Sequence, residues 1–344
     1  MKKLIFFFAL ISFSACTNLI IDDDEPITPI NNFEIFWNDF NQHYSLFTIR
    51  NINWNNLYEI YRPQINETTS DEELWNILSN LIEQLDDSHT VLFDGNGNNY
   101  HSGYALNKQS TSEFSKELLT SKYLDLVNNI PSEDGLSFGK IKNKNIGYIY
   151  LGTMDGENPS IINSVINELK DYSAIILDVR QNTGGDDKYS SKIAQAFSDG
   201  KHFIYTVQTR NGINHDDFDN KKQYHTYPNK ENSYVKPVIV LTDRKTISAG
   251  EIFLLHMKSF KHIVQIGDTT AGDFSTVSNM RFLPNSWHYN YSIQKFLLPN
   301  GESLDGIGHI PDVYTKNNKS DITSSNDKVI EKAIQYLFDE YKIE

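Results

Sequence analysis

Apolar and polar positions divide the chain into two parts with different periodicity. Apolar residues recur at helical spacing over 33–44 and again over 74–85, and the second run follows a Thr-Ser-Asp-Glu sequence of the kind that caps and begins helices. We therefore predict helices within residues 33–93. Residues 94–135 are rich in Asn, Gly and Ser, and we expect a loop-rich connection there with one helix near 113–127.

Beyond about residue 137, short apolar runs typical of buried strands alternate with amphipathic segments typical of helices. This alternation predicts βαβ units and a mostly parallel sheet, so the second part is expected to be an α/β domain. Strands are expected at 146–151, 174–179, 203–209, 235–241 and 263–266, and helices at 161–169, at 189–197, from 252 and at about 325–342.

Length and charge limit the kinds of function. The 344 residues are more than one hydrophobic core usually serves, so we expect two domains or one enlarged α/β domain. The formal net charge of −14 and the lack of a basic run argue against a protein that tracks nucleic-acid phosphates. Cys16 is the single cysteine, which rules out an intrachain disulfide and a cysteine-based zinc cluster.

The first sixteen residues have the pattern of an export signal. Lys2 and Lys3 precede an apolar stretch that is too short to span a bilayer, and small residues follow before Cys16. Residues 13–16, Phe-Ser-Ala-Cys, resemble a bacterial lipobox, which predicts cleavage before Cys16, its acylation and anchoring to a membrane. The alternative is a plain signal peptide with an incidental cysteine.

An acidic stretch with two prolines, residues 16–31, follows the predicted cleavage site, and we expect it to be a solvated tether. Its Asp-Asp-Asp-Glu run at 22–25 also resembles surface-export signals of some Gram-negative outer-membrane lipoproteins. We therefore expect an exported, lipid-anchored protein of the cell envelope, in the outer membrane, with the periplasmic and the surface side both open.

Three polar loops are predicted at the carboxyl ends of strands, where open α/β sheets place their sites. They cover residues 178–185, 241–252 and 298–312. Ser248 lies between a strand and a helix, where its hydroxyl can enter a cleft and the next amide, of Ala249, can bind an anion. Each loop also has an ordinary structural interpretation: a glycine turn, a helix cap by Ser248, and a surface hairpin.

Taken together and in this order, the loops resemble the tail-specific (carboxy-terminal processing) serine peptidase family. The resemblance covers about residues 137–315 and implies a ClpP/crotonase-like core, with a helical cap formed by the N-terminal segment. Four motifs carry it: Leu-Asp-Val-Arg-Gln-Asn-Thr-Gly-Gly at 177–185, Thr-Ile-Ser-Ala-Gly-Glu-Ile at 246–252, Gly-Asp-Thr-Thr-Ala-Gly at 267–272 and Gly-Ile-Gly-His-Ile-Pro-Asp at 306–312.

The resemblance also implies the catalytic groups, with Ser248 as the nucleophile of an acyl-enzyme mechanism. Many members use a lysine directly after the third motif, but Asp273 occupies that position, and an aspartate cannot act as a neutral amine base. A tricorn-like branch takes its base from the helical segment instead. In this chain that branch implies His89 as the base, Ser88 as a relay and Asp305 as the orienting carboxylate.

Other assignments stay open at this point. His309 is an alternative base, and His89 taken alone could simply cap the end of a helix. The resemblance further implies an oxyanion hole made by the amide of Ala249 together with that of Gly185 or Gly184.

The histidines show no metal-ligand spacing, so we expect neither a metal nor another cofactor. Glu251 and Arg180 are expected to be structural. A non-catalytic ligand- or peptide-binding lipoprotein on the same fold is the main alternative, because Asp273 and Asp305 depart from the family pattern. A surface adhesion or structural lipoprotein would have neither a reactive serine nor a cleft.

The predicted order of domains is a signal peptide, an acidic tether, a helical cap domain, a connecting segment and a peptidase domain. About 45 residues separate the cap from the first core strand, too few for the PDZ domain of lysine-type members. We therefore expect general hydrolysis of exported peptides or unfolded proteins. The boundaries are 1–15, 16–31, 32–95, 96–136 and 137–344.

Overall fold

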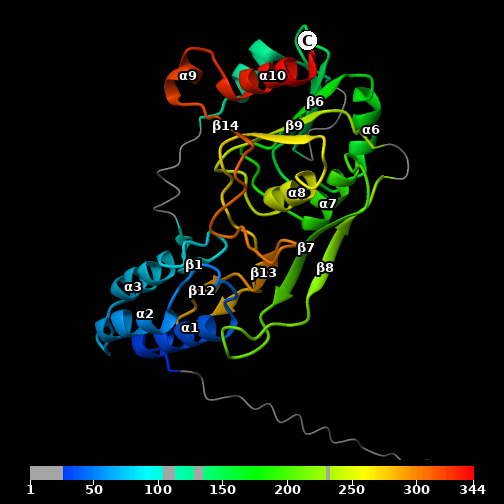
Figure 1. Ribbon diagram of the computed structural model, residues 1–344. Coiled ribbons are helices and arrows are strands. Elements are labelled where there is room, and N and C mark those ends of the chain that lie inside the picture. Colours follow the sequence, from blue (N-terminus) through cyan, green and yellow to red (C-terminus); the bar gives the residue numbers. More distant parts are fainter. Residues whose placement is uncertain (1–25, 104–112, 128–134, 230–232) are drawn as a thin grey trace, which may run out of the picture.

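The computed structural model describes residues 26–103, 113–127, 135–229 and 233–344 (Figure 1). Its N-terminal part contains the helices α1 (Pro29–His43), α2 (Trp54–Tyr61) and α3 (Asp71–Glu83), with a short 3-10 helix, η1 (Arg62–Gln64), after α2. Thr28 caps α1 through its side chain, and Ser70 forms a capping box with Glu73 at the start of α3. The helical periodicity and the cap residues therefore act as the sequence predicts.

A seven-stranded sheet forms the centre of the second part. It contains β3 (Leu124–Leu126), β4 (Leu136–Ile141), β5 (Ile146–Leu151), β6 (Ala174–Asp178), β9 (Val238–Thr242), β10 (Ile263–Gly267) and β14 (Val313–Tyr314). The strand order is β14-β10-β9-β6-β5-β4-β3, and the five strands from β14 to β5 run parallel. β4 and β3 add an antiparallel edge. The prediction of an α/β fold with a mostly parallel sheet is confirmed.

Helices cover both faces of this sheet, as the nearly continuous burial of its middle strands requires. One face packs against α6 (Ile161–Leu169), α7 (Asp187–Gln195) and α8 (Ala249–Met257), through side chains such as Val165 and Phe253. The other face packs against α10 (Lys328–Tyr341), α5 (Lys116–Leu118) and the π-helical turn η2 (Leu119–Tyr123). A short helix, α9 (Lys319–Thr323), precedes α10.

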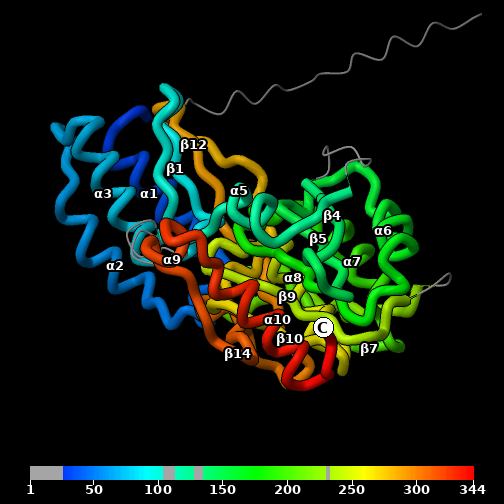
Figure 2. The backbone as a smooth tube through the Cα atoms, turned by 90° about the horizontal axis from the view of Figure 1, so that it is seen from above, coloured from blue at the N-terminus to red at the C-terminus, as the bar shows by residue number. Residues whose placement is uncertain are grey.

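The N-terminal helices pack against a second sheet whose strands come from both halves of the chain (Figure 2). It has the order β11-β12-β1-β2 and consists of β1 (Val91–Phe93), β2 (Asn99–His101), β11 (Arg281–Phe282) and β12 (His288–Asn290). The Phe36 and Phe40 rings lie 4.7 Å and 5.6 Å from the ring of Tyr289. The segment around Tyr289 thus completes the cap core, whereas the sequence analysis assigned it to the catalytic domain.

A third sheet connects the two cores. It has the order β13-β7-β8 and consists of β7 (His202–Thr209), β8 (Lys222–Thr226) and β13 (Gln294–Leu297). In Figure 1 the β7–β8 ribbon runs from the α7 region toward the N-terminal helices. Tyr205 and Phe296 belong to a small core that also contains Ile252 of α8, so this ribbon is fixed to the helix that follows Ser248.

Three local expectations were wrong. Residues 113–127 form α5, a π-turn and β3, not one helix. The strand expected from 235 begins at Val238, after Pro237, which has no N–H to donate to a neighbouring strand. β8 was not predicted, because its Lys-Gln-Tyr-His-Thr sequence is polar and mostly exposed.

The predicted signal peptide, the acylation site at Cys16 and most of the acidic tether lie outside the described residues. Within the part of the chain that the structure describes, the helices are all too short or too polar to cross a bilayer.

Candidate active site

The carboxyl ends of three adjacent parallel strands meet at one edge of the central sheet. The loop after β6 carries Gly184 and Gly185, the loop after β9 carries Ser248, and the loop after β10 carries Asp273. Strand adjacency in the order β10-β9-β6 thus brings together motifs that are about 25 to 63 residues apart in the sequence. The predicted polar loops 178–185 and 241–252 thus meet at this edge. The third predicted loop, 298–312, follows β13 of a different sheet and reaches the site through the loop after β10, where the Gly306 N–H donates to the Gly272 carbonyl.

Ser248 occupies a strained position directly before α8. Its backbone has φ 56° and ψ −124°, in a region that a non-glycine residue rarely adopts. Its side chain does not cap the helix; instead Oγ lies 3.1 Å from Nε2 of His89. The capping interpretation of Ser248 is therefore wrong, and the serine and the histidine are within hydrogen-bond distance although 159 positions separate them.

His89 reaches the cleft from the loop between α3 and β1, so the helical cap supplies it. Asp87 fixes this loop: its Oδ1 accepts the backbone N–H of His89 at 3.1 Å, and its Oδ2 accepts the Thr90 hydroxyl at 3.1 Å. The second ring nitrogen, Nδ1, is buried and has no hydrogen-bond partner among the described residues. Asp87 Oδ1 lies 3.8 Å from it, too far for a hydrogen bond but close enough to stabilise a positive imidazolium.

The structure does not contain the expected relay from Ser88 to Asp305. The Ser88 hydroxyl donates instead to Asp273 Oδ2. Asp305 accepts the backbone N–H of Phe274 at 2.9 Å through Oδ2 and pairs with Arg50 through Oδ1. The carboxylate that contacts Ser88 is thus the residue that replaces the family's lysine, and the expected pairing of Ser88 with Asp305 is corrected.

Arg50, which the sequence analysis did not single out, connects these groups. Its Nε lies 2.6 Å from Asp305 Oδ1 and its Nη2 lies 2.8 Å from Asp273 Oδ1, and its side chain is only 5% exposed. Nη2 also donates to the Gly272 carbonyl at 3.2 Å. Burial raises the pKa of Asp305 to about 7, although the Arg50 guanidinium opposes this rise. One cap residue thus neutralises two buried carboxylates behind the serine and the histidine.

The backbone amides of Gly185 and Ala249 donate to no group among the described residues. Gly185 lines the same cleft as Ser248, and its φ of 142° and close approach to Met154 leave no room for a Cβ atom. The amide of Gly184, in contrast, already donates to Asn182 Oδ1 at 3.0 Å. Of the predicted oxyanion donors, Gly185 and Ala249 are therefore available, and Gly184 is not.

Glu251 holds the loop after β10 in place through three hydrogen bonds. Its carboxylate accepts the Thr270 hydroxyl at 2.5 Å, the Gly272 N–H at 2.8 Å and the Asp273 N–H at 2.8 Å. His309, the alternative base, donates its Nε2–H to the Glu251 carbonyl, 2.9 Å away, and burial lowers its pKa to about 3. His309 therefore contacts the scaffold of the loop, whereas His89 contacts Ser248.

Arg180 fixes the loop after β6 in a similar way. Its guanidinium binds Asp178 and Asp327, with Nη2 2.6 Å from Asp178 Oδ2 and Nη1 2.9 Å from Asp327 Oδ2, and all three side chains are buried. This ion-pair triad ties the loop to the start of α10. The geometry of Arg180 and Glu251 agrees with the structural roles expected for both.

The serine and histidine line a cleft of about 450 Å³, within the range of ligand sites. Aromatic side chains from β7, β8 and β13 form one wall, and the start of α7 forms another. The sequence analysis missed Asp187 of this wall, although it lies only two residues after Gly185.

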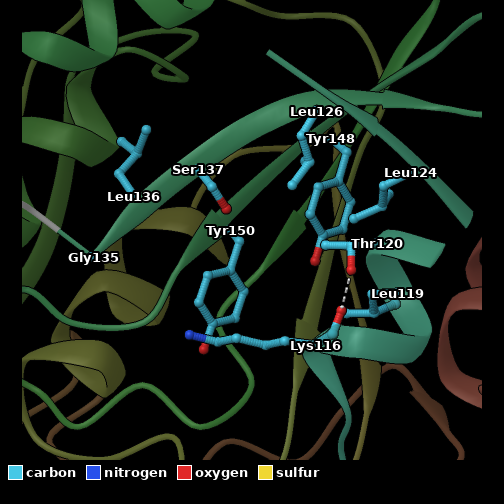
Figure 3. Close-up of a pocket in the computed structure, with 10 residues that line it drawn as sticks. All are labelled: Lys116, Leu119, Thr120, Leu124, Leu126, Gly135, Leu136, Ser137, Tyr148 and Tyr150. Atoms are coloured by element: carbon cyan, nitrogen blue, oxygen red, sulfur yellow. Dashed lines mark hydrogen bonds between the residues drawn. The ribbon is translucent and has the colours of Figure 1, made fainter. Parts of the chain in front are cut away.

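A separate cavity of about 200 Å³ lies beside η2, β4 and β5 (Figure 3). Its lining is mostly apolar, with Tyr148 and Tyr150 among the leucines, and the Lys116 Nζ lies 4.4 Å from the centre of the Tyr150 ring. Neither Ser248 nor His89 lines it, so it belongs to a different region of the molecule.

A serine beside a histidine, with free amides at the carboxyl edge of a parallel sheet, is the arrangement of serine hydrolases. Comparison with known families is more specific: residues 145–315 match the model of peptidase family S41, and residues 30–83 match that of the tricorn protease C1 domain. Residues 145–315, just under half of the chain, therefore form a peptidase family S41 domain.

Curated relatives and solved structures agree with this family. The chain is 27% identical over 179 residues to carboxy-terminal processing protease CtpB of Bacillus subtilis and 26% identical over 216 residues to CtpA of the same organism. These matches cover 52% and 58% of this chain but only 35% and 44% of the relatives. The chain therefore aligns with less than half the length of each relative.

Among solved structures, a candidate peptidase from Parabacteroides merdae matches with a TM-score of 0.81 and 26% identity, covering 91% of this chain and 97% of its own. The tricorn protease matches with a TM-score of 0.56 and 15% identity, covering 91% of this chain and 37% of its own. The second likeness shows the fold alone. Both extend over the cap and the central sheet, in agreement with the predicted tricorn-like arrangement.

Proposed function

We propose that this protein is a serine endopeptidase in which Ser248 is the nucleophile and His89 is the general base. The observation that carries the proposal is the 3.1 Å separation of Ser248 Oγ and His89 Nε2 in a cleft that Gly185 also lines. The amides of Gly185 and of Ala249, the residue directly after Ser248, donate to no group among the described residues. The family of the chain supports the same reaction class.

In the proposed mechanism, Ser248 Oγ attacks the peptide carbonyl carbon while His89 Nε2 takes the hydroxyl proton. The tetrahedral oxyanion is bound by the amides of Gly185 and Ala249, the second of which lies at the N-terminus of α8. His89 then gives its proton to the leaving amine, and the acyl-enzyme is hydrolysed by water with His89 as base. No step requires a metal or a cofactor.

The imidazolium formed in this mechanism is stabilised by Asp87, whose carboxylate is fully buried and lies 3.8 Å from Nδ1. Ser88 and Asp273 act as positioning residues. Their hydrogen bond ties the backbone of the His89 loop to the loop after β10, which Arg50 and Glu251 hold in place. Asp305 contacts neither Ser88 nor His89 and acts through its ion pair with Arg50.

For the substrate, we propose peptides or unfolded segments of exported proteins. The relatives are named carboxy-terminal processing proteases, which supports a peptide substrate. We propose that an extended segment binds in the cleft of about 450 Å³ that Ser248 and His89 line, without the need for a free chain end.

We further propose that the protein is exported and anchored to the outer membrane through acyl chains on Cys16. The proposal rests on the sequence alone: a basic start, an apolar stretch and the Phe-Ser-Ala-Cys motif at 13–16. Metabolic labelling with a clickable palmitate analogue should mark the wild type and leave Cys16→Ser unlabelled. Labelling of both proteins, or of neither, would contradict the anchor.

The peptidase proposal is tested with a fluorophosphonate probe and an internally quenched peptide library. Wild-type protein should be labelled on Ser248 and should cut peptides, whereas Ser248→Ala and His89→Ala should do neither at a detectable rate while keeping the wild-type circular dichroism. His309→Gln is the matched histidine control, and Ser248 of this variant should still be labelled by the probe. A correctly folded wild type that neither labels nor cuts would instead favour a ligand- or peptide-binding lipoprotein.

A further inference from the structure

Asp187 is a carboxylate in the catalytic cleft that has no partner among the residues that the structure describes. It is the first residue of α7, two positions after Gly185, and it lines the same cleft as Ser248 and His89. Its neighbour Asp186 caps α7 by accepting the Lys188 N–H at 2.6 Å. Within the described residues, Asp187 makes neither a hydrogen bond nor an ion pair, so the helix cap does not account for it.

The surroundings of Asp187 raise the cost of its negative charge. It is half-buried, and aspartates in such places are usually paired. Asp186 adds a second negative charge on the same helix end. Burial, and then the charge of Asp186, raise the pKa of Asp187 to about 6, and His89 across the cleft opposes the rise. A positive group bound in the cleft would relieve both effects.

The aromatic part of the cleft lining suits the stem of a long cationic side chain. Tyr205 and Tyr224 stack with ring centres 4.8 Å apart and an interplanar angle of 13°, and Phe296 lies 5.4 Å from the Tyr205 ring. All three line the cleft with Asp187. Aromatic faces pack the methylenes of lysine or arginine and attract their charged ends, while the carboxylate supplies the counter-charge.

We propose that Asp187 is a specificity-determining residue that selects substrates with a lysine or arginine side chain in this cleft. The proposal rests on the proposed peptidase function. Lys188 is the cationic side chain that lines the cleft next to Asp187; it is exposed and forms no ion pair with Asp187. The −14 net charge of the chain adds a long-range attraction for cationic segments.

A helix-terminal aspartate also has an ordinary structural role, because a negative charge in the first turn of a helix is favourable. The test must therefore separate recognition of a cation from stability of α7. The relevant quantity is the ratio of kcat/KM for two quenched peptides that differ only in lysine against methionine at one position, because a loss of folded enzyme cancels in this ratio. The position is first chosen by sequencing the new termini in a digest of unfolded casein.

Wild-type protein should favour the lysine peptide about 10- to 100-fold, the range of one hydrogen bond to a charged group. Asp187→Asn should bring the ratio close to one, whereas Asp187→Glu should keep most of the preference. Asp171→Asn, an exposed aspartate in the α6–β6 turn, is the matched control and should keep the wild-type ratio.

An equal ratio in wild type and Asp187→Asn, with active and labelled enzyme, would overturn the role of Asp187 and leave the peptidase proposal intact. If wild type neither labels on Ser248 nor cuts any peptide, the proposed function fails, and the specificity proposal fails with it. The two failures are therefore distinguishable.

Discussion

The side chain of Arg50 pairs with Asp305 of the catalytic part of the molecule, with Nε 2.6 Å from Oδ1. Arg50 lies between α1 and α2 of the cap, 255 positions from Asp305, and it also binds Asp273. Ser88 and His89 belong to the same cap as Arg50. The Arg50–Asp305 ion pair therefore fixes the position of the base, His89, relative to the nucleophile, Ser248. The cap is therefore part of the active site.

Arg50→Ala should destabilise the protein by about 3–5 kcal/mol, because it leaves two buried carboxylates without their cation. It should also lower kcat/KM by separating His89 from Ser248. Urea unfolding followed by circular dichroism measures the first effect and peptide cleavage the second. Arg50→Lys should recover only part of the loss, since an ammonium cannot reproduce the fork that reaches both carboxylates.

Arg62→Ala is the matched control for this variant. Arg62 forms an ion pair of the same 2.6 Å length with Glu34, also within the cap, but both side chains are about 30% exposed. Its loss should cost less than about 1 kcal/mol, because water screens the pair. Equal losses in the free energy of unfolding for Arg50→Ala and Arg62→Ala would show that burial of the Arg50 ion pairs adds nothing to stability.

The Ser88–Asp273 hydrogen bond leads to a second prediction. Ser88→Ala and Asp273→Asn should each lower kcat/KM about tenfold, the cost of one hydrogen bond to a charged group. If both residues act through this bond, the double variant should lose little more than either single variant. Stopped-assay cleavage of one quenched peptide by the four proteins measures this cycle.

A matched double-mutant cycle uses Asp305→Asn in place of Asp273→Asn. Because Asp305 does not contact Ser88 and reaches it only through Arg50 and Asp273, the coupling of Ser88→Ala with Asp305→Asn should be clearly weaker than its coupling with Asp273→Asn. Strong coupling of Ser88 to Asp305, with none to Asp273, would restore the pairing expected from the sequence. In that case the positioning role assigned to Asp273 would be wrong.

The conformation of Ser248 leads to a third prediction, about stability. A residue with a side chain is strained at φ 56° and ψ −124°, whereas glycine adopts this conformation without strain because it has no Cβ atom. Ser248→Gly should therefore be more stable than Ser248→Ala by about 1 kcal/mol, although neither variant should cleave peptides. Thermal unfolding of the two inactive variants makes the comparison. Equal or reversed stability would mean that the strain is absent in solution.

The central sheet was predictable because its strands are continuous apolar runs with helices between them. The strand expected at 146–151 is β5, and the polar loops after 178 and 241 lie at one edge, as parallel topology demands. The second half of the cap was not predictable in the same way. β11 and β12 are two and three residues long, and long-range contacts assign their segment to the N-terminal core, among them the pairing of β12 with β1 and the packing of Tyr289 on Phe36 and Phe40.

For the site, the resemblance of four ordered motifs to the serine peptidase family selected Ser248, and the tricorn-like branch of that family selected His89. Taken alone, each residue also had an ordinary structural interpretation. The choice between Asp273 and Asp305 was not accessible from the sequence. Both carboxylates come from neighbouring loops and both reach Arg50, so a difference in side-chain direction decides which one Ser88 contacts. Arg50 itself lies in a turn between helices, where an arginine usually faces solvent, and nothing in its sequence context separates it from Arg62.

The last prediction concerns pH and His256, which is buried on α8 and contacts Ser191 through Nε2 at 2.9 Å. Burial lowers the pKa of His256 to about 4, so the unfolded chain binds this proton more readily than the folded chain between about pH 6.5 and 4. Stability from the neutral ring is thus present above pH 6.5 and is lost as the pH falls. Relative to His256→Leu, wild type should lose about 1.4 kcal/mol between pH 8 and pH 5.5, measured by urea unfolding, with the difference at pH 8 giving the pH-independent cost of the substitution. A difference that stays constant over this range would mean that water reaches the ring and that the α7–α8 packing is looser than the structure shows.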